Sequence, residues 1–218
     1  MQWIQRLILA LSMALLGGSL GSIPHLDAHE HTQETVPTHV FDNLGGDFAL
    51  TGFSGEKVSL KQFSGKVVIL NFGYTSCPDI CPLTLANLKQ AMSQLGEQAK
   101  QVQVLWVTVD PTRDTPARMK EYLGNFHPHF LGLTGTPKEI SEVARNYQTL
   151  RQKQPLTEDP PPKKTPQAPA ASSEPGYLVA HTDFIYVLNR SGKVEMMYGS
   201  DVPIPTLVAK IQQVLRNR

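Results

Sequence analysis

Cysteine is scarce in this sequence: only two of its 218 residues, Cys77 and Cys81, carry a thiol. A small secreted domain stapled by disulfides uses more cysteines at wider spacings, so a disulfide framework is not expected. An excess of one charge is also missing, because the formal net charge is +1. Phosphate binding needs a clustered basic field, and no segment is dense enough in Lys or Arg to supply one. We therefore expect no nucleic-acid partner.

Long apolar runs are missing as well, apart from one at the N-terminus, residues 7–23. Arg6 precedes this run and small residues end it, which is the order typical of an export signal. Because the run is short for a membrane span, residues 1–23 are predicted to be a signal peptide or an uncleaved membrane anchor. The polar, histidine-containing residues 24–40 are predicted to be a flexible tether. The folded domain is then expected outside the cytoplasm, in the periplasm or on the outer face of the bacterial cytoplasmic membrane, where disulfides persist.

Residues 41–218 are predicted to form one domain that begins with strands. Short alternating segments at 48–51 and 58–60 flank a Ser-Gly turn and predict an N-terminal hairpin. The runs 67–72 and 102–109 are almost continuously apolar, as in strands buried on both faces of a sheet. Further strands are predicted at 130–133, 177–180, 183–188 and 193–198.

Helices are predicted at 82–95, 116–125, 137–147 and 203–215. Two of them are announced by the pairs Thr115-Pro116 and Thr136-Pro137, each with a capping hydroxyl before a proline at the first helical position. Strands that alternate with helices and then end in a hairpin predict an α/β fold. We expect a central mixed sheet with helices on both faces.

One internal segment, residues 151–176, differs in composition from the rest of this domain. It is rich in proline, alanine, serine and lysine and has almost no large apolar side chain. Such a segment buries too little surface to offset the entropy lost on ordering it. We predict a disordered, proline-rich insertion, because the segment is too long for an ordinary connection.

The two cysteines lie in the segment 73–82, GYTSCPDICP, which joins a buried strand to a helix. Open α/β sheets place their ligand sites at this end of a strand. Positions i and i+4 share one face of a helical turn, so the two thiols could bind one metal ion or form a disulfide. The expected helix N-terminus beside Cys81 favours its thiolate, the form that binds metals and attacks disulfides.

Several interpretations of this pair stay open at this point. Inert buried cysteines are disfavoured by the flanking prolines, and a static disulfide over so short a loop would stabilise little. A thioredoxin-type redox site uses two intervening residues, whereas this motif has three. As a metal site, two soft thiolates select copper(I), zinc or an iron–sulfur cluster, and a histidine such as His181 is a common third donor for copper. A lone histidine in a strand is, however, more often a structural residue.

Three motifs together resemble the Sco/SenC family of copper-binding assembly proteins. They are GYTSCPDICP at 73–82, VDPTRDTP at 109–116 and AHT at 180–182, and they occur in the family's order. The resemblance spans about residues 41–215 without the insertion. It implies a thioredoxin-like fold and a role in assembling the copper centre of cytochrome c oxidase. It also implies that Cys77, Cys81 and His181 bind copper, as Cu(I) or Cu(II), with one ion per chain.

Two carboxylates near these residues are further candidates for the site. The family commonly has an aspartate before the histidine, where this sequence has Ala180, so Asp183 is the nearby carboxylate that could take its place. Asp79, between the cysteines, is either a solvated loop residue or lies within reach of the metal or a partner surface. Asp110, Arg113 and Asp114 are expected to organise the turn before the next helix.

Two functions follow from the resemblance and the cysteine chemistry. The first is an extracytoplasmic copper metallochaperone, not an enzyme, whose partner is the copper-site subunit of cytochrome c oxidase. The alternative is a thiol–disulfide oxidoreductase, with Cys77 and Cys81 catalytic, that reduces the cysteines of the oxidase copper site. In both cases the oxidised protein carries a Cys77–Cys81 disulfide. Other expected partners are a second copper chaperone, a thioredoxin-like reductant, and the membrane if the N-terminus is uncleaved.

Overall fold

The computed structural model describes residues 43–155 and 176–217. The predicted signal or anchor, the tether and most of the proline-rich insertion lie outside these residues. The helices and strands, in chain order, are β1 (Ala49–Thr51), β2 (Lys57–Ser59), η1 (Leu60–Phe63), β3 (Val67–Gly73), α1 (Ile80–Leu95), η2 (Gly96–Gln101), β4 (Val102–Thr108), α2 (Pro116–Gly124), β5 (Leu131–Leu133), α3 (Pro137–Asn146), β6 (Arg151–Pro155), β7 (Tyr177–His181), β8 (Phe184–Leu188), β9 (Val194–Gly199) and α4 (Ile204–Arg216).

A five-stranded mixed sheet in the order β5-β4-β3-β8-β9 forms the centre of the domain. β3 pairs in parallel with β4, and β4 with β5, whereas β8 is antiparallel to both β3 and β9. β1 and β2 form the predicted N-terminal hairpin. In the described ranges no helix is long and apolar enough to cross a bilayer.

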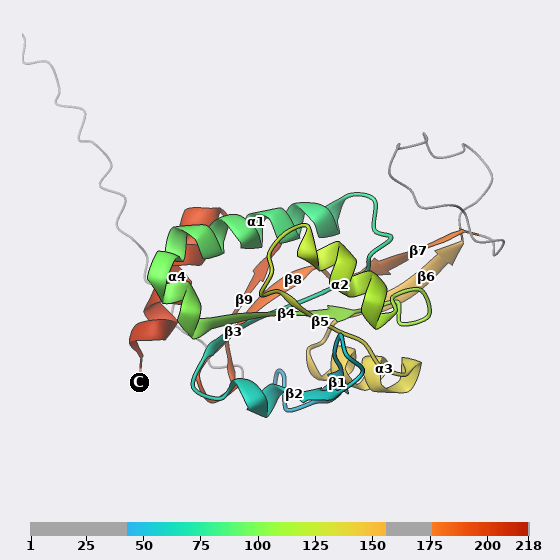
Figure 1. The fold of residues 1–218 in the computed structure, drawn as a ribbon, viewed down its shortest axis with the longest axis horizontal. Helices are drawn as coiled ribbons and strands as arrows, with labels where there is room; N and C mark the ends of the chain where they lie inside the picture. Colours follow the sequence, from blue (N-terminus) through green and yellow to red (C-terminus); the bar gives the residue numbers. More distant parts are fainter. Residues whose placement is uncertain (1–42, 156–175, 218) are drawn as a thin grey trace, which may run out of the picture. The chain divides into compact units, whose positions relative to one another are not determined.

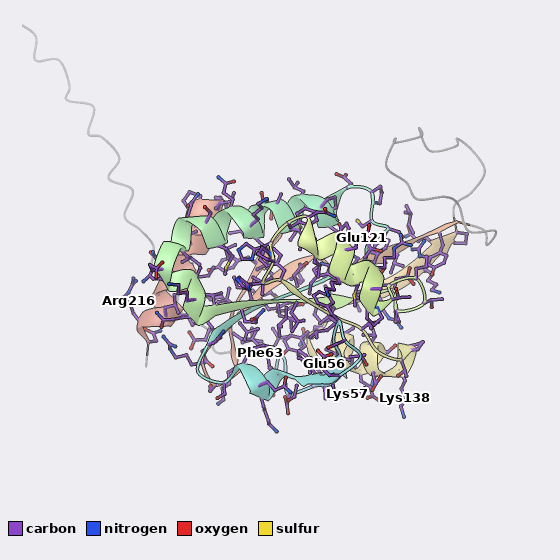
Figure 2. All side chains as sticks on the ribbon, in the orientation of Figure 1. Glu56, Lys57, Phe63, Glu121, Lys138 and Arg216 are labelled. Atoms are coloured by element: carbon purple, nitrogen blue, oxygen red, sulfur yellow. The ribbon has the colours of Figure 1, made fainter. Side chains whose placement is uncertain are left out.

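Side chains from β3 alternate between two hydrophobic cores, one on each face of the sheet. Val67 and Ile69 pack with α1, α2 and α4, while Val68 and Leu70 pack with α3 and the β1–β2 hairpin. Figure 1 shows these layers on opposite sides of the sheet, and the side chains fill the space between the layers (Figure 2). All seven residues of β3 are buried, because both faces are covered. The prediction of an α/β fold with helices on both faces is confirmed.

Both predicted helix caps are present. The side chain of Thr115 accepts a hydrogen bond from the backbone N–H of Arg118 at the start of α2. Thr136 forms a reciprocal capping box with Glu139 at the start of α3, which satisfies two backbone donors that would otherwise be unpaired. The first of these caps starts α2 directly after the segment 109–115.

The predicted insertion begins later than its composition suggests. Residues Arg151–Pro155 are not disordered but form β6, which pairs antiparallel with β7 in a separate two-stranded sheet (Figure 1). β6 is mostly exposed, so backbone hydrogen bonds to β7 hold it in place rather than apolar burial. A prediction based on apolar content therefore misses it. The β6–β7 hairpin matters for the site because its last residue is His181, paired with Arg151.

Candidate metal centre

The two cysteines meet at the end of β3, but not on one helical turn as the i, i+4 spacing predicted. α1 begins at Ile80, so Cys81 lies in its first turn and Cys77 lies in the preceding loop. Asp79, the residue before the helix, has φ −138° and ψ −78°, and this bend returns the loop so that the two thiols form a hydrogen bond. Both cysteines are reduced; Cys81 is only 1% exposed, whereas Cys77 is half-buried.

His181 comes to the same place from the β6–β7 hairpin. Its Nε2 lies 3.8 Å from the Sγ of Cys81, although the two residues are 100 positions apart in the sequence. Its Nδ1 lies 3.1 Å from the carbonyl oxygen of Thr182. A carbonyl oxygen can only accept a hydrogen bond, so Nδ1 is the donor of this pair, and Nε2 is the ring nitrogen that faces the thiol. A neutral ring with its proton on Nδ1 is the tautomer that a metal-binding Nε2 requires.

The donor set of Cys77, Cys81 and His181 fits a soft metal ion, since it offers two sulfurs and one imidazole nitrogen. The three side chains converge without being arranged in advance for coordination. In the described ranges no group of three or more His, Cys, Asp or Glu side chains already forms a metal cluster.

The two thiols have different pKa values, because their surroundings differ. The hydrogen bond from Cys81, with added help from the backbone N–H groups of Asp79 and Cys81, lowers the pKa of Cys77 to about 6 despite partial burial. The same hydrogen bond and deeper burial raise the pKa of Cys81 above the ordinary thiol value. The expectation that the helix N-terminus makes Cys81 the thiolate is therefore wrong. The hydrogen bond to Cys77, together with burial, keeps Cys81 protonated, and Cys77 is the more acidic thiol.

Alkylation of the reduced protein by iodoacetamide should reveal the lower pKa of Cys77. Because the thiolate reacts and the thiol does not, the rate at Cys77 is expected to rise with pH through an inflection near pH 6. The Cys81→Ala variant, which removes the hydrogen-bond donor, should move this inflection upward toward the ordinary thiol range. Inflections near pH 9 in both proteins would contradict the assignment.

Asp183 is held by buried polar groups and not by the histidine. One of its oxygens accepts a hydrogen bond from Asn71 Nδ2 (3.2 Å) and the other accepts one from Thr84 Oγ1 (3.4 Å). Asn71 is 1% exposed in the middle of β3, and its amide also donates to the carbonyl oxygen of Phe184 (3.0 Å). The turn that follows His181 is thereby tied to β3 and α1. Asp79 is exposed, and its side chain makes no capping hydrogen bond.

A second network fixes the loop that carries Cys77. Asp114, 1% exposed, accepts hydrogen bonds from the backbone N–H (3.1 Å) and the hydroxyl (2.6 Å) of Thr75, and from Thr108 Oγ1 (2.6 Å). Arg118 on α2 donates to Thr75 Oγ1 (2.7 Å) and Ser76 Oγ (3.0 Å). The sequence predicted a turn-forming role for Asp114. The structure adds direct hydrogen bonds from Thr75, in the loop that carries Cys77, to the Asp114 carboxylate.

Asp110 and Arg113 anchor the hairpin that carries His181. The hydroxyl of Tyr177 donates to Asp110 (2.8 Å), while Arg113 pairs with Asp110 and donates to the carbonyl of Tyr177 (3.0 Å). The Arg113 guanidinium lies 3.8 Å from the Tyr177 ring centroid. Tyr74, next to the cysteine loop, accepts a hydrogen bond from the backbone N–H of Val179 (3.3 Å). The motif at 109–116 thus joins both parts of the site.

Asn71, Thr75, Thr84 and Arg118 were not identified as site residues from the sequence. Asn71 carries a readable signal, because it is the only polar side chain in the apolar run 67–72, and a buried amide needs partners. The other three are ordinary in type and position. Only the folded structure brings Arg118 to Thr75, 43 residues away.

Comparison with known proteins identifies relatives over almost the whole described domain. A model of the SCO1/SenC family matches residues 37–216. A SCO2-like protein of Rickettsia conorii is 30% identical over 190 residues, which cover 86% of each chain. The copper-bound structure of ScoI from Bradyrhizobium japonicum has 32% identity and a TM-score of 0.65, and the match covers 79% of this chain and 99% of that one.

A more distant structure extends the likeness in fold. The protein BsSco is 21% identical with a TM-score of 0.60, over 83% of this chain and 98% of its own. Its structure is described as revealing a disulfide switch in a member of the Sco family of cytochrome c oxidase assembly proteins. Together with the closer structure, this likeness confirms the predicted thioredoxin-like fold.

Proposed function

The chain belongs to the SCO1/SenC family, and from that premise we propose that it is a copper metallochaperone acting outside the cytoplasm. Copper is its cargo. Cys77, Cys81 and His181 hold one ion in the reduced protein and deliver it to the copper-site subunit of cytochrome c oxidase. Residues 1–23 export the domain or attach it to the membrane.

The approach of His181 Nε2 to within 3.8 Å of Cys81 Sγ is the observation that carries this proposal. Two thiolates alone serve disulfide exchange, whereas an imidazole nitrogen that faces a buried thiol completes a three-donor set suited to copper. The network around Asp183 holds the turn beside the histidine, in the way that residues around a metal site usually orient its ligands.

Release of the ion is coupled to the oxidation state of the cysteines. When Cys77 and Cys81 form a disulfide, they give up two electrons and two protons and can no longer donate thiolates to copper. A partner disulfide that accepts these electrons and protons becomes a pair of thiols. The reduced protein therefore carries cargo and the oxidised protein does not.

The difference in pKa and burial between the two thiols favours a second candidate function, a thiol–disulfide oxidoreductase acting on the oxidase copper site. Cys77 is accessible and has the lowered pKa of an attacking thiol, while Cys81 is buried behind it. The Cys77 thiolate would attack a partner disulfide and release one partner thiolate. Cys81 would then attack the mixed disulfide, so that the partner leaves as a dithiol and the Cys77–Cys81 disulfide forms.

Copper(I) titration of the purified chain tests the chaperone proposal. The reduced protein is expected to bind one equivalent in competition with a chromogenic copper(I) chelator. The same protein oxidised to the Cys77–Cys81 disulfide is expected to bind none, because its sulfurs are no longer thiolates. Equal binding by the oxidised protein, or full binding by a Cys77→Ser variant, would place the copper elsewhere and reject the proposal.

A further inference from the structure

Large apolar side chains that are exposed in the described ranges are few, and all of them adjoin the candidate metal ligands. They are Ile80, 36% exposed, Leu83, 53% exposed, and Leu150, 78% exposed. Single exposed apolar residues scattered over a surface need no explanation. Here each of the three either lies within two positions of Cys81 in α1 or is hydrogen-bonded to the residue that follows His181, and exposed apolar residues concentrated around a site mark interaction surfaces.

Two of the three residues stand beside the cysteines. Ile80 and Leu83 lie three positions apart in the first turn of α1, so they share a face of the helix on either side of Cys81 in the sequence. Half-buried Cys77 precedes them in the loop. A partner molecule that contacts the sulfur of Cys77 must also approach the first turn of α1.

The third residue stands beside the histidine. The backbone N–H of Thr182 donates to the carbonyl of Leu150 (3.0 Å), and the N–H of Leu150 donates to Thr182 Oγ1 (3.1 Å). Leu150 is therefore fixed next to the residue that follows His181. It lies between α3 and β6, and α3 covers the opposite face of the sheet from α1 (Figure 1). Exposed apolar residues thus neighbour both Cys81, in α1, and Thr182, which follows His181.

We propose that Ile80, Leu83 and Leu150 form a docking surface, here called the apolar rim, for the protein that accepts copper from this site. The proposal rests on the proposed function and adds the surface through which it works. The acceptor presents its own thiolate or imidazole donors inside an apolar border. Where that border meets Asp79, which is exposed on the same loop, it is neutral or basic.

The chemistry of transfer identifies this occupant. A copper ion held by tight ligands leaves through ligand exchange, in which an incoming donor bonds to the ion before the outgoing one departs. Zinc–sulfur bonds are about 2.3 Å long, and on that scale the incoming donor must come within a few ångströms of Cys77. A protein acceptor that reaches this position covers the neighbouring rim. A contact of so few residues suits a transient complex that must release its partner.

Two rates of copper(I) removal from the loaded chain test the rim. One acceptor is the soluble copper-binding domain of a cytochrome c oxidase subunit; the other is bathocuproine disulfonate, a small chelator that needs no docking surface. In the triple variant Ile80→Ser/Leu83→Ser/Leu150→Ser, transfer to the protein domain is expected to slow at least tenfold. Removal by the chelator is expected to stay within about twofold of the wild type, as is the copper stoichiometry.

Matched variants separate docking from other effects. Gln90→Ser changes an exposed residue two turns further along α1 and is expected to leave both rates unchanged. The single Leu150→Ser variant is expected to slow protein transfer alone, which keeps the test valid if the triple variant folds poorly. Because the side chain of Leu150 is so exposed, the Leu150→Ser variant should unfold at the same temperature as the wild type.

The outcomes that overturn the proposal are distinct. Normal copper binding with unchanged transfer to the oxidase domain rejects the rim and leaves the proposed function standing. A wild-type chain that binds no copper rejects the proposed function and the rim with it. Unchanged transfer combined with weaker binding to anionic phospholipid vesicles assigns these side chains to a membrane surface, and this also rejects the rim.

Discussion

Replacing His181 by alanine is expected to lower the affinity of the reduced chain for copper(I) by roughly 100-fold. The basis is the affinity of structural zinc sites, whose four ligands together supply about 10–16 kcal/mol, or roughly 3 kcal/mol per ligand. Thiol–disulfide exchange at Cys77 should meanwhile stay within about twofold, since both sulfurs remain and His181 contributes only a minor part of the lowered pKa of Cys77. Competition with a copper(I) chelator and reduction of a small disulfide substrate measure the two quantities.

The cysteine variants provide the comparison for His181. Cys81→Ser is expected to abolish both stoichiometric copper binding and complete disulfide exchange, because the buried thiol serves in both. If His181→Ala kept wild-type copper affinity, the three-donor site would be wrong, and the oxidoreductase would become the better interpretation. If it lost disulfide exchange as well, the histidine would be acting through the thiols themselves.

Asp114→Ala is expected to lower the free energy of unfolding by about 2–4 kcal/mol. The variant removes three hydrogen bonds to a buried carboxylate, each worth about 1.5–3 kcal/mol, and it also removes the cost of burying that charge. It frees the N–H and hydroxyl of Thr75, so the loop that carries Cys77 should become more mobile. Urea unfolding measures the first effect, and faster amide hydrogen exchange at Thr75 and Ser76 measures the second.

The pH dependence of Asp114→Asn provides a control for this interpretation. Burial outweighs the hydrogen bonds and raises the pKa of Asp114 above the ordinary value for an aspartate. A raised pKa in the folded state means that the stabilising contribution is full below the unfolded pKa and is lost as the pH rises through the folded pKa. The wild type should therefore lose stability relative to Asp114→Asn over that window. Parallel stability curves would show that the carboxyl does not titrate as described.

Most of the central sheet could be predicted from the sequence, because its strands depend on local patterns. The buried strands β3 and β4 appear as almost continuous apolar runs, and the helices α2 and α3 begin at Thr-Pro caps that the structure retains. β6 could not be predicted, since its residues are polar and only pairing with β7 makes them a strand. Apolar content says nothing about such backbone pairing.

The sequence names the residues of the candidate site, but it does not predict how they are arranged. The motifs point to Cys77, Cys81 and His181, but they do not predict the bend at Asp79. They also do not predict that Cys77 has the lower pKa and Cys81 the higher one, because this depends on burial and on one hydrogen bond. The roles of Thr75 and Arg118 require contacts between segments about 40 residues apart. Such long-range pairs leave no periodic trace in the sequence.

The position of His181 on a hairpin outside the central sheet has a consequence for local unfolding. β7 pairs with β6 and with no strand of the five-stranded sheet, so the hairpin can open without breaking that sheet's strand pairing. An ion held jointly by Cys81 and His181 would cross-link the hairpin to α1. Its binding free energy would add to the cost of opening, about 4 kcal/mol at a free ion concentration 1,000 times Kd. Loss of the cargo would then release one wall of the site to open more often.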